Sequence, residues 1–247
     1  MRIKFLDFIE PVTRHLILAN FIIWIISTAA YHISDFDFSR YLGLHYFASP
    51  DYLPTQIVTY MFMHDTHGIA HIFCNMFSLF MFGQILEQTL GGKRFLFYYM
   101  STGIGAAMIQ LLIMRFEIAS IASGLPVDVV ETVYREGYSV LSQAKNYVEP
   151  NMAEMNLLIN TPIVGASGAV FGILLAFGMM YPNEILSIFF IFDIKAKYAV
   201  IGYGVLELVF GVSGVMSNIA HFAHLGGMLI GLLIILIWRK KGIIRGN

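Results

Sequence analysis

Charged residues are scarce in this sequence. Asp, Glu, Lys and Arg make up 13% of its 247 residues, about half of the ~25% that is usual in soluble domains. Hydrophobic residues make up 57%, and the mean hydropathy is +0.71. This balance excludes an ordinary soluble domain and predicts an integral membrane protein.

Cysteine is nearly absent, since Cys74 is the only one. A single thiol excludes a disulfide framework within the chain and most cysteine-based metal sites. The net charge of −1 offers no basic surface of the kind that binds nucleic acid. The first apolar run lacks a small-residue cleavage site and no transit peptide is visible, so we expect that run to stay in the membrane.

The apolar runs predict an all-α membrane protein with six transmembrane helices and a polar insert between the third and the fourth. A helix needs ~20 apolar residues to cross a bilayer. The expected spans are 16–33, 68–90, 95–114, 162–181, 198–214 and 218–238.

The remaining segments are polar or too short to cross. The insert, 115–160, is expected to hold one or two amphipathic helices, one of them over 127–138. The apolar stretch 184–194 reads as a re-entrant or interfacial piece. The domains that we expect are a head (1–15), the six-span domain (16–238) and a basic tail (239–247).

The basic residues predict the orientation. Six spans place both termini on one side, and loops rich in Lys and Arg stay in the cytoplasm. Eleven of the 15 basic residues fall on the side of the termini. We therefore expect a multi-pass protein with both termini cytoplasmic. Because no transit peptide is visible at the N-terminus, we expect it in the plasma (inner) membrane of a prokaryote.

Polar residues of three spans are expected at one depth. The second, fourth and sixth spans all run inward from the outer face. Ser167 lies about five residues into the fourth span, ~7–8 Å below its end, and His224 lies about six residues into the sixth. His71 is near the start of the second span, with Asn75 one turn deeper on the same face.

Small residues allow the fourth and sixth spans to approach closely, because they let two helix backbones meet in a membrane. The two stripes of small residues are Gly165, Ala169, Gly172 and Ala176, and Ala223, Gly227 and Gly231.

These residue types predict acyl-transfer chemistry. Serine becomes a nucleophile when an adjacent base takes its proton, and histidine is the usual base. The oxyanion formed on attack needs hydrogen-bond donors, which the side chains of His71 and Asn75 and the backbone N–H of Ser167 can supply. No acid lies at this depth in the second, fourth or sixth span. The predicted site is therefore a Ser167–His224 dyad.

The residues that carry this prediction resemble the rhomboid family of intramembrane serine proteases. The match consists of Gly165-Ala166-Ser167-Gly168, the run from Ala223 to Gly231, and His71 to Asn75. The order of these motifs and the six-span frame agree with the family, and the likeness covers about Tyr52 to Trp238.

The resemblance implies an intramembrane serine endopeptidase that uses no metal or cofactor. Its substrates would be membrane proteins, cut in or near a transmembrane helix through an acyl-enzyme, with Ser167 as nucleophile, His224 as base, and His71 and Asn75 at the oxyanion. It also implies a structural role for Glu87. Two features depart from the family: Thr66 replaces a histidine five residues before His71, with His64 lying seven before, and the insert is long.

Other interpretations use the same residues. An inactive rhomboid-like protein would bind transmembrane helices without cutting them, but would normally lack the serine or the histidine. His221 could be the base by spacing, although the glycines after His224 fit the family better. A transporter would use the intramembrane Glu207, which could instead pair with a polar neighbour. A zinc site at His64, His67 and His71 lacks an HExxH motif and a base.

Overall fold

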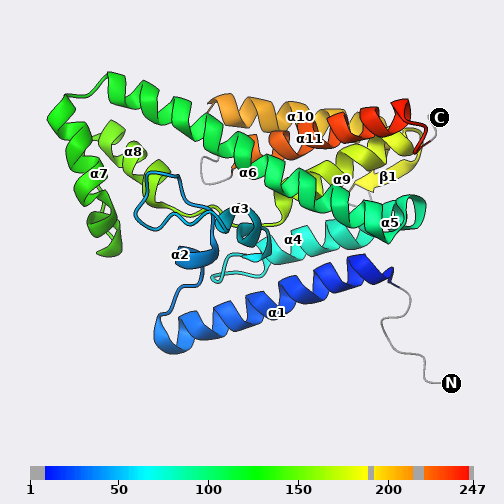
Figure 1. Cartoon of the computed structure of the whole chain (residues 1–247), viewed down its shortest axis with the longest axis horizontal. Coiled ribbons are helices and arrows are strands. Elements are labelled where there is room, and N and C mark those ends of the chain that lie inside the picture. Colours follow the sequence, from blue (N-terminus) through cyan, green and yellow to red (C-terminus); the bar gives the residue numbers. More distant parts are fainter. Residues whose placement is uncertain (1–8, 189–191, 214–219, 245–247) are drawn as a thin grey trace.

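The computed structural model describes residues 9–188, 192–213 and 220–244, and the fold is nearly all-α (Figure 1). Among these residues, four helices are long and apolar enough to cross a membrane. They are α1 (Pro11–Ser34), α6 (Gly92–Ser123), α10 (Ala196–Ser213) and α11 (His221–Lys240). A shorter apolar helix, α9 (Ser167–Met180), packs against α6, α10 and α11.

The predicted second span forms three consecutive helical segments. These are α4 (Ala70–Ser78), the π-helical turn η2 (Leu79–Gly83) and α5 (Gln84–Leu90). The junction residues Leu79 and Gln84 keep right-handed helical backbone angles, so the rod is continuous. It ends at Gly91, whose φ of 77° is in the left-handed region that favours glycine.

Glu87 joins this rod to the first helix. Its carboxylate is buried and accepts hydrogen bonds from the backbone N–H groups of Val12 and Thr13, at 2.8 and 2.7 Å, and from the Thr13 hydroxyl at 2.8 Å. The first N–H groups of a helix have no partner within it. Glu87 therefore satisfies the start of α1, which is the structural role that the family resemblance implied.

The connection between α1 and α4 is ordered by one buried amide. Gln56 accepts the backbone N–H of His45 at 3.2 Å and donates to the carbonyls of Tyr41 and Asp51 at 3.2 and 2.8 Å. This amide holds three parts of a mostly irregular segment together. Its short helices are α2 (Ser39–Leu42), α3 (Gln56–Thr59) and the 3₁₀ turn η1 (Tyr60–Phe62).

Two helices lie at the end of the molecule opposite both termini (Figure 1). They are α7 (Val127–Ser142), which includes the helix predicted over 127–138, and α8 (Pro150–Asn160). The predicted end of the third span, Met114, is wrong because α6 continues to Ser123. No Gly or Pro occurs between these residues, whereas Gly124 and Pro126 follow the true end.

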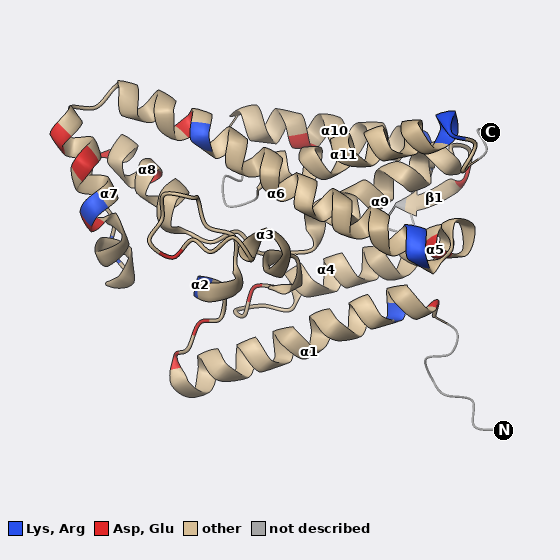
Figure 2. Ribbon diagram, viewed as in Figure 1, with Lys and Arg blue, Asp and Glu red and all other residues tan. Residues whose placement is uncertain are grey.

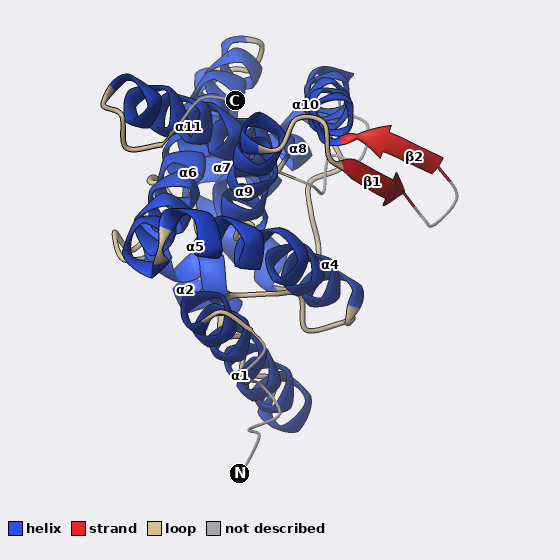
Figure 3. Cartoon of the chain, turned by 90° about the vertical axis from the view of Figure 1, so that its right-hand side faces the viewer, coloured by secondary structure: helices blue, strands red, loops and turns tan. Residues whose placement is uncertain are grey.

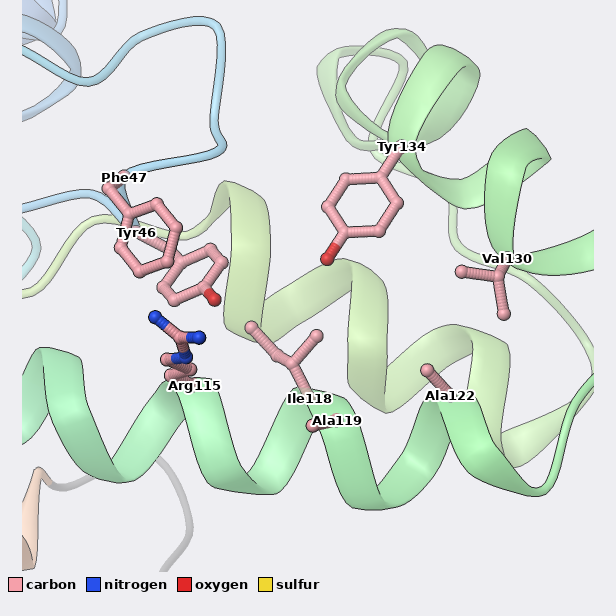
Figure 4. Close-up of a pocket in the computed structure, with 8 residues that line it drawn as sticks. All are labelled: Tyr46, Phe47, Arg115, Ile118, Ala119, Ala122, Val130 and Tyr134. Carbon is pink, nitrogen blue, oxygen red and sulfur yellow. The ribbon is translucent and has the colours of Figure 1, made fainter. Parts of the chain in front are cut away.

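A shallow pocket of about 360 Å³ separates α7 from α6 (Figure 4). The guanidinium of Arg115 points toward Tyr46 and Phe47, and the hydroxyl of Tyr134 faces the pocket from α7. Its other lining residues are Ile118, Ala119, Ala122 and Val130.

The stretch 184–194 contains two strands, a correction to the all-α expectation. β1 (Ile185–Ile188) pairs antiparallel with β2 (Phe192–Lys195), with Leu186 opposite Ile194. The hairpin lies beside the start of α10 (Figure 3). β-branched and aromatic residues dominate both strands, which is typical of strands in general.

The predicted close approach of α9 and α11 is present. A Cβ added at Gly227 would collide with the carbonyl oxygen of Gly168, and one added at Gly172 would lie 2.7 Å from the Cβ of Thr102 on α6. The Tyr98 hydroxyl of α6 donates to the carbonyl of Gly172 at 2.8 Å. Backbone contact at small residues therefore holds α6, α9 and α11 together.

We expect Gly227→Ala to destabilise the protein by about 1–3 kcal/mol or more, because two backbones would have to separate. Gly202→Ala on α10 is the matched control, since nothing lies within 4 Å of its added methyl group. Thermal unfolding in detergent micelles measures both variants. Equal midpoints for the two would contradict the packing described.

Candidate active site

Ser167 is the first residue of α9, so the predicted helix start at Pro162 and the predicted depth of Ser167 within the helix are wrong. The preceding chain is extended instead. Ile163 and Leu44 exchange two backbone hydrogen bonds of 2.8 and 2.9 Å. Gly165 then donates its N–H to the carbonyl of Tyr60 at 3.0 Å.

Gly165 permits the turn into α9. Its φ of 129° lies in the region that L-residues rarely adopt, and an added Cβ would lie 2.7 Å from Nε2 of His71. Both the backbone angle and the neighbouring ring therefore require glycine here.

The late start of α9 leaves the Ser167 N–H without a helical partner. In a helix that began at Pro162, this N–H would bond to the carbonyl of Ile163. That carbonyl accepts the N–H of Leu44 instead, and the first hydrogen bond of α9 runs from the N–H of Val170 to the carbonyl of Ala166. The start of a helix also carries partial positive charge. A hydrogen-bond donor thus lies beside the Ser167 hydroxyl.

Ser167 and His224 meet between α9 and α11, as the sequence predicted. Nε2 of His224 lies 2.8 Å from Oγ of Ser167. Phe171, one turn along α9, stacks on the imidazole with ring centroids 4.2 Å apart and planes at 5°. The stacking fixes the plane of the imidazole, and the contact distance allows proton transfer between the hydroxyl and Nε2. His224 is the fourth residue of α11, which begins at His221; the predicted start at Asn218 lies outside the described residues.

His71 and Asn75 lie on α4 and line the same cleft as Ser167. The N–H of Asp65 donates to Nδ1 of His71 at 3.4 Å, so Nε2 carries the proton in the neutral ring. Asn75 donates one amide hydrogen to the carbonyl of His71 at 2.9 Å, and its amide group has a second. Each side chain can therefore offer a donor to an oxyanion.

His64 lies beside His71 despite its unusual spacing in the sequence. The two ring centroids are 5.1 Å apart. His64 is buried in the turn between η1 and α4, where desolvation lowers its pKa to about 3. The longer turn therefore still brings a neutral histidine to this position.

Glu207 of α10 is an acid at this site that the predicted dyad does not include, because that prediction considered acids of the second, fourth and sixth spans only. Its Oε2 lies 2.9 Å from Nδ1 of His224 and 2.7 Å from Nδ1 of His221. The signal was present in the sequence, since Glu207 lies seven residues from the outer end of the predicted fifth span, close to the depth expected for Ser167 and His224. His221 is buried and its Nδ1 contacts this carboxylate.

Among the residues that the structure describes, Glu207, His221 and His224 are also a group that could hold a metal ion. Their ligand atoms lie within 4.8 Å of one another, and two histidines with one carboxylate are a donor set that zinc uses. Ligands of tetrahedral zinc stand about 3.3 Å apart at bond lengths near 2.05 Å. The carboxylate–imidazole separations of 2.7 and 2.9 Å are shorter and fit shared protons better.

A cleft of about 2030 Å³ leads to Ser167 and His224. Its apolar walls come from α4 and η2 on one side and from α9 and α10 on the other. Residues lining these walls include Phe73, Phe77, Met81, Tyr203 and Phe210.

The comparison with protein families identifies the fold. Residues 54–241 match the model of the rhomboid domain, and the chain belongs to the rhomboid family. Together with its apolar helices, this makes it a multi-pass membrane protein.

Curated relatives come from Arabidopsis thaliana. RHOMBOID-like protein 6, mitochondrial, is 24% identical over 177 residues, which are 71% of this chain and 41% of that protein. RHOMBOID-like protein 1 is 27% identical over 172 residues, 68% of this chain and 30% of that protein. RHOMBOID-like protein 12, mitochondrial, is 26% identical over 177 residues, 70% and 43% of the two chains. The chain spans less than half the length of each.

Proposed function

We propose that this protein is an intramembrane serine endopeptidase that cuts peptide bonds in or near the transmembrane helices of other membrane proteins. The observation that carries the proposal is the 2.8 Å contact between Oγ of Ser167 and Nε2 of His224 at the end of a large apolar cleft. Membership of the rhomboid family supports the same reaction class.

The reaction proceeds through an acyl-enzyme. Ser167 attacks the scissile carbonyl carbon while His224 takes the hydroxyl proton on Nε2. The oxyanion receives hydrogen bonds from the Ser167 N–H, Nε2 of His71 and the amide of Asn75. His224 then gives its proton to the leaving amine, and water hydrolyses the ester by the same steps.

The membrane arrangement is part of the proposal. Counting the continuous rod from α4 to α5 and the shorter α9 with the four long helices gives six crossings. Lys and Arg gather at the end that holds both termini, around α5 and the end of α11 (Figure 2), which favours cytoplasmic termini. The plasma membrane of a prokaryote stays a prediction from the sequence; two relatives carry "mitochondrial" in their names, and fractionation of the native source tests it.

Replacing the nucleophile or the base tests the proposed reaction. Ser167→Ala and His224→Ala should each lower kcat for a fluorescent transmembrane substrate in liposomes by at least about 10³-fold, because the two groups act as a unit. A fluorophosphonate probe should label the wild type and not Ser167→Ala.

Normal cleavage by Ser167→Ala would remove the enzyme interpretation. A folded wild type that the probe does not label would instead identify an inactive, helix-binding member of the family.

Removing a side-chain donor tests the oxyanion site. Asn75→Ala should lower kcat by about 10²–10³-fold with little change in KM, because the donor acts on charge that develops during the reaction. The neighbouring Cys74→Ser variant, exposed on the same helix, is the control. An unchanged kcat for Asn75→Ala would exclude the proposed role.

Substrate helices should enter between α4 and α10, where the cleft has its two apolar walls. Cys74 is the native thiol of one wall, and Tyr203→Cys places a second on the other. Joining the two thiols with a bifunctional maleimide should abolish cleavage of a transmembrane substrate while labelling by the small fluorophosphonate persists. The reagent-treated wild type, with its single thiol, is the control, and full cleavage by the cross-linked protein would contradict this entrance.

A further inference from the structure

Glu207 occupies the one inward-facing stripe of an otherwise exposed helix. Most of α10 faces outward. Its less exposed positions gather at its start and then recur at helical spacing: Ala196, Lys197, Ala199, Val200, Gly204, Glu207, Phe210 and Gly211. The Glu207 side chain is 13% exposed. Burying a carboxylate in a membrane helix is energetically unfavourable unless the group is paired. An acid at such a place therefore indicates a functional role.

The partners of this carboxylate are two imidazoles of α11. Oε2 lies 2.7 Å from Nδ1 of His221 in a hydrogen bond and 2.9 Å from Nδ1 of His224. The second contact has the separation of an ion pair, but its N–H is not well aimed at the oxygen. Catalytic hydrogen bonds are often poorly aligned before substrate binds and tighten in the complex.

A carboxylate at Nδ1 decides which nitrogen of His224 carries the proton. A neutral imidazole has one N–H, and an ionised carboxylate can only accept. The proton therefore lies on Nδ1, facing Glu207, and Nε2 is the free acceptor that faces the Ser167 hydroxyl at 2.8 Å. This is the form of the ring that can act as a base toward serine.

We propose that Glu207 is a positioning residue that extends the Ser167–His224 pair to a Ser–His–Glu triad; the inference rests on the proposed function. When Oγ of Ser167 bonds to the substrate carbon, the hydroxyl proton moves to Nε2 of His224. The imidazolium then carries a positive charge beside the carboxylate of Glu207, which keeps its negative charge and takes no proton. His224 returns to neutral when it protonates the leaving group.

His221 has its own part in this arrangement. Its ring lies 6.4 Å from the ring of His224 at 88°, and its Nδ1 holds the shared oxygen of Glu207. This hydrogen bond from His221 supports the ionised form of the Glu207 carboxylate. His221 is therefore a support for Glu207 rather than a rival base.

The test uses labelling by a fluorophosphonate probe, because this reaction needs no knowledge of the natural substrate. Ser167 attacks phosphorus, fluoride leaves, and the hydroxyl proton passes to His224. In the full-length protein in liposomes, Glu207→Gln should lower the maximal labelling rate by about 10²–10⁴-fold, as loss of a triad carboxylate does. The half-saturating probe concentration should stay unchanged.

The pH dependence of the labelling rate separates a triad role of Glu207 from a role in packing alone. Because Glu207→Gln removes the negative charge that faces Nδ1 of His224, the acidic limb of the labelling profile should move to lower pH by about one to three units. His64 and His71 are present in both proteins, so the difference between the profiles reports the loss of Glu207 at its two partners, His221 and His224. Glu207→Asp keeps the charge and should keep the wild-type limb at a reduced rate.

Three controls make the outcome decisive. Glu184→Gln removes an exposed carboxylate just before the hairpin and should match the wild type in rate and profile. Thermal unfolding establishes that Glu207→Gln is folded. A chelator should leave the labelling of the wild type unchanged. Loss of labelling in the presence of the chelator would instead assign Glu207, His221 and His224 to a metal site.

The failure of this inference is distinct from that of the proposed function. If Glu207→Gln is labelled specifically at Ser167 with the rate and the pH profile of the wild type, the role of Glu207 is overturned and the proposed function stands. Equal labelling of the wild type and Ser167→Ala would overturn both.

Discussion

The contact of the α9 and α11 backbones at Gly168 and Gly227 is the constraint on which the site depends. Ser167 is the neighbour of one glycine, and His224 lies one turn before the other. Because no side chain separates the helices, their register fixes Oγ of Ser167 at 2.8 Å from Nε2 of His224. In a membrane, such packing replaces the hydrophobic drive that holds soluble helices together.

The second constraint is that α9 must not begin too early. The extended stretch before it is held by Leu44 and Tyr60, which belong to the connection between α1 and α4. That connection therefore has a chemical consequence, since it occupies the carbonyl of Ile163 and keeps the N–H of Ser167 available. The irregular segment ordered by Gln56 thus fixes where α9 begins, although the segment contributes neither Ser167 nor His224.

Periodicity in the sequence was sufficient to place most of the helices but not their ends, because periodicity depends on local spacing. The small-residue stripes indicated that α9 and α11 approach closely, which brings Ser167 to His224. The start of α9 could not be predicted, because Pro162 is a good first residue for a helix and the partners of Ile163 and Gly165 are distant in sequence. The strands at 185–188 and 192–195 were missed because a short apolar run fits several structures. Glu207 was noticed, but its partner depends on how α10 leans on α11, which no local pattern encodes.

The acid on α10 restricts how a substrate can enter. α10 is the most exposed of the helices around the cleft, yet it carries the carboxylate that contacts His224. If Glu207 supports the base, α10 cannot move away from α11 as a rigid body without separating the two groups. An entrance compatible with an intact site therefore opens by a tilt of α10 about the level of Glu207, or by side-chain movement along the α4 wall. Access and chemistry would then depend on the same contact.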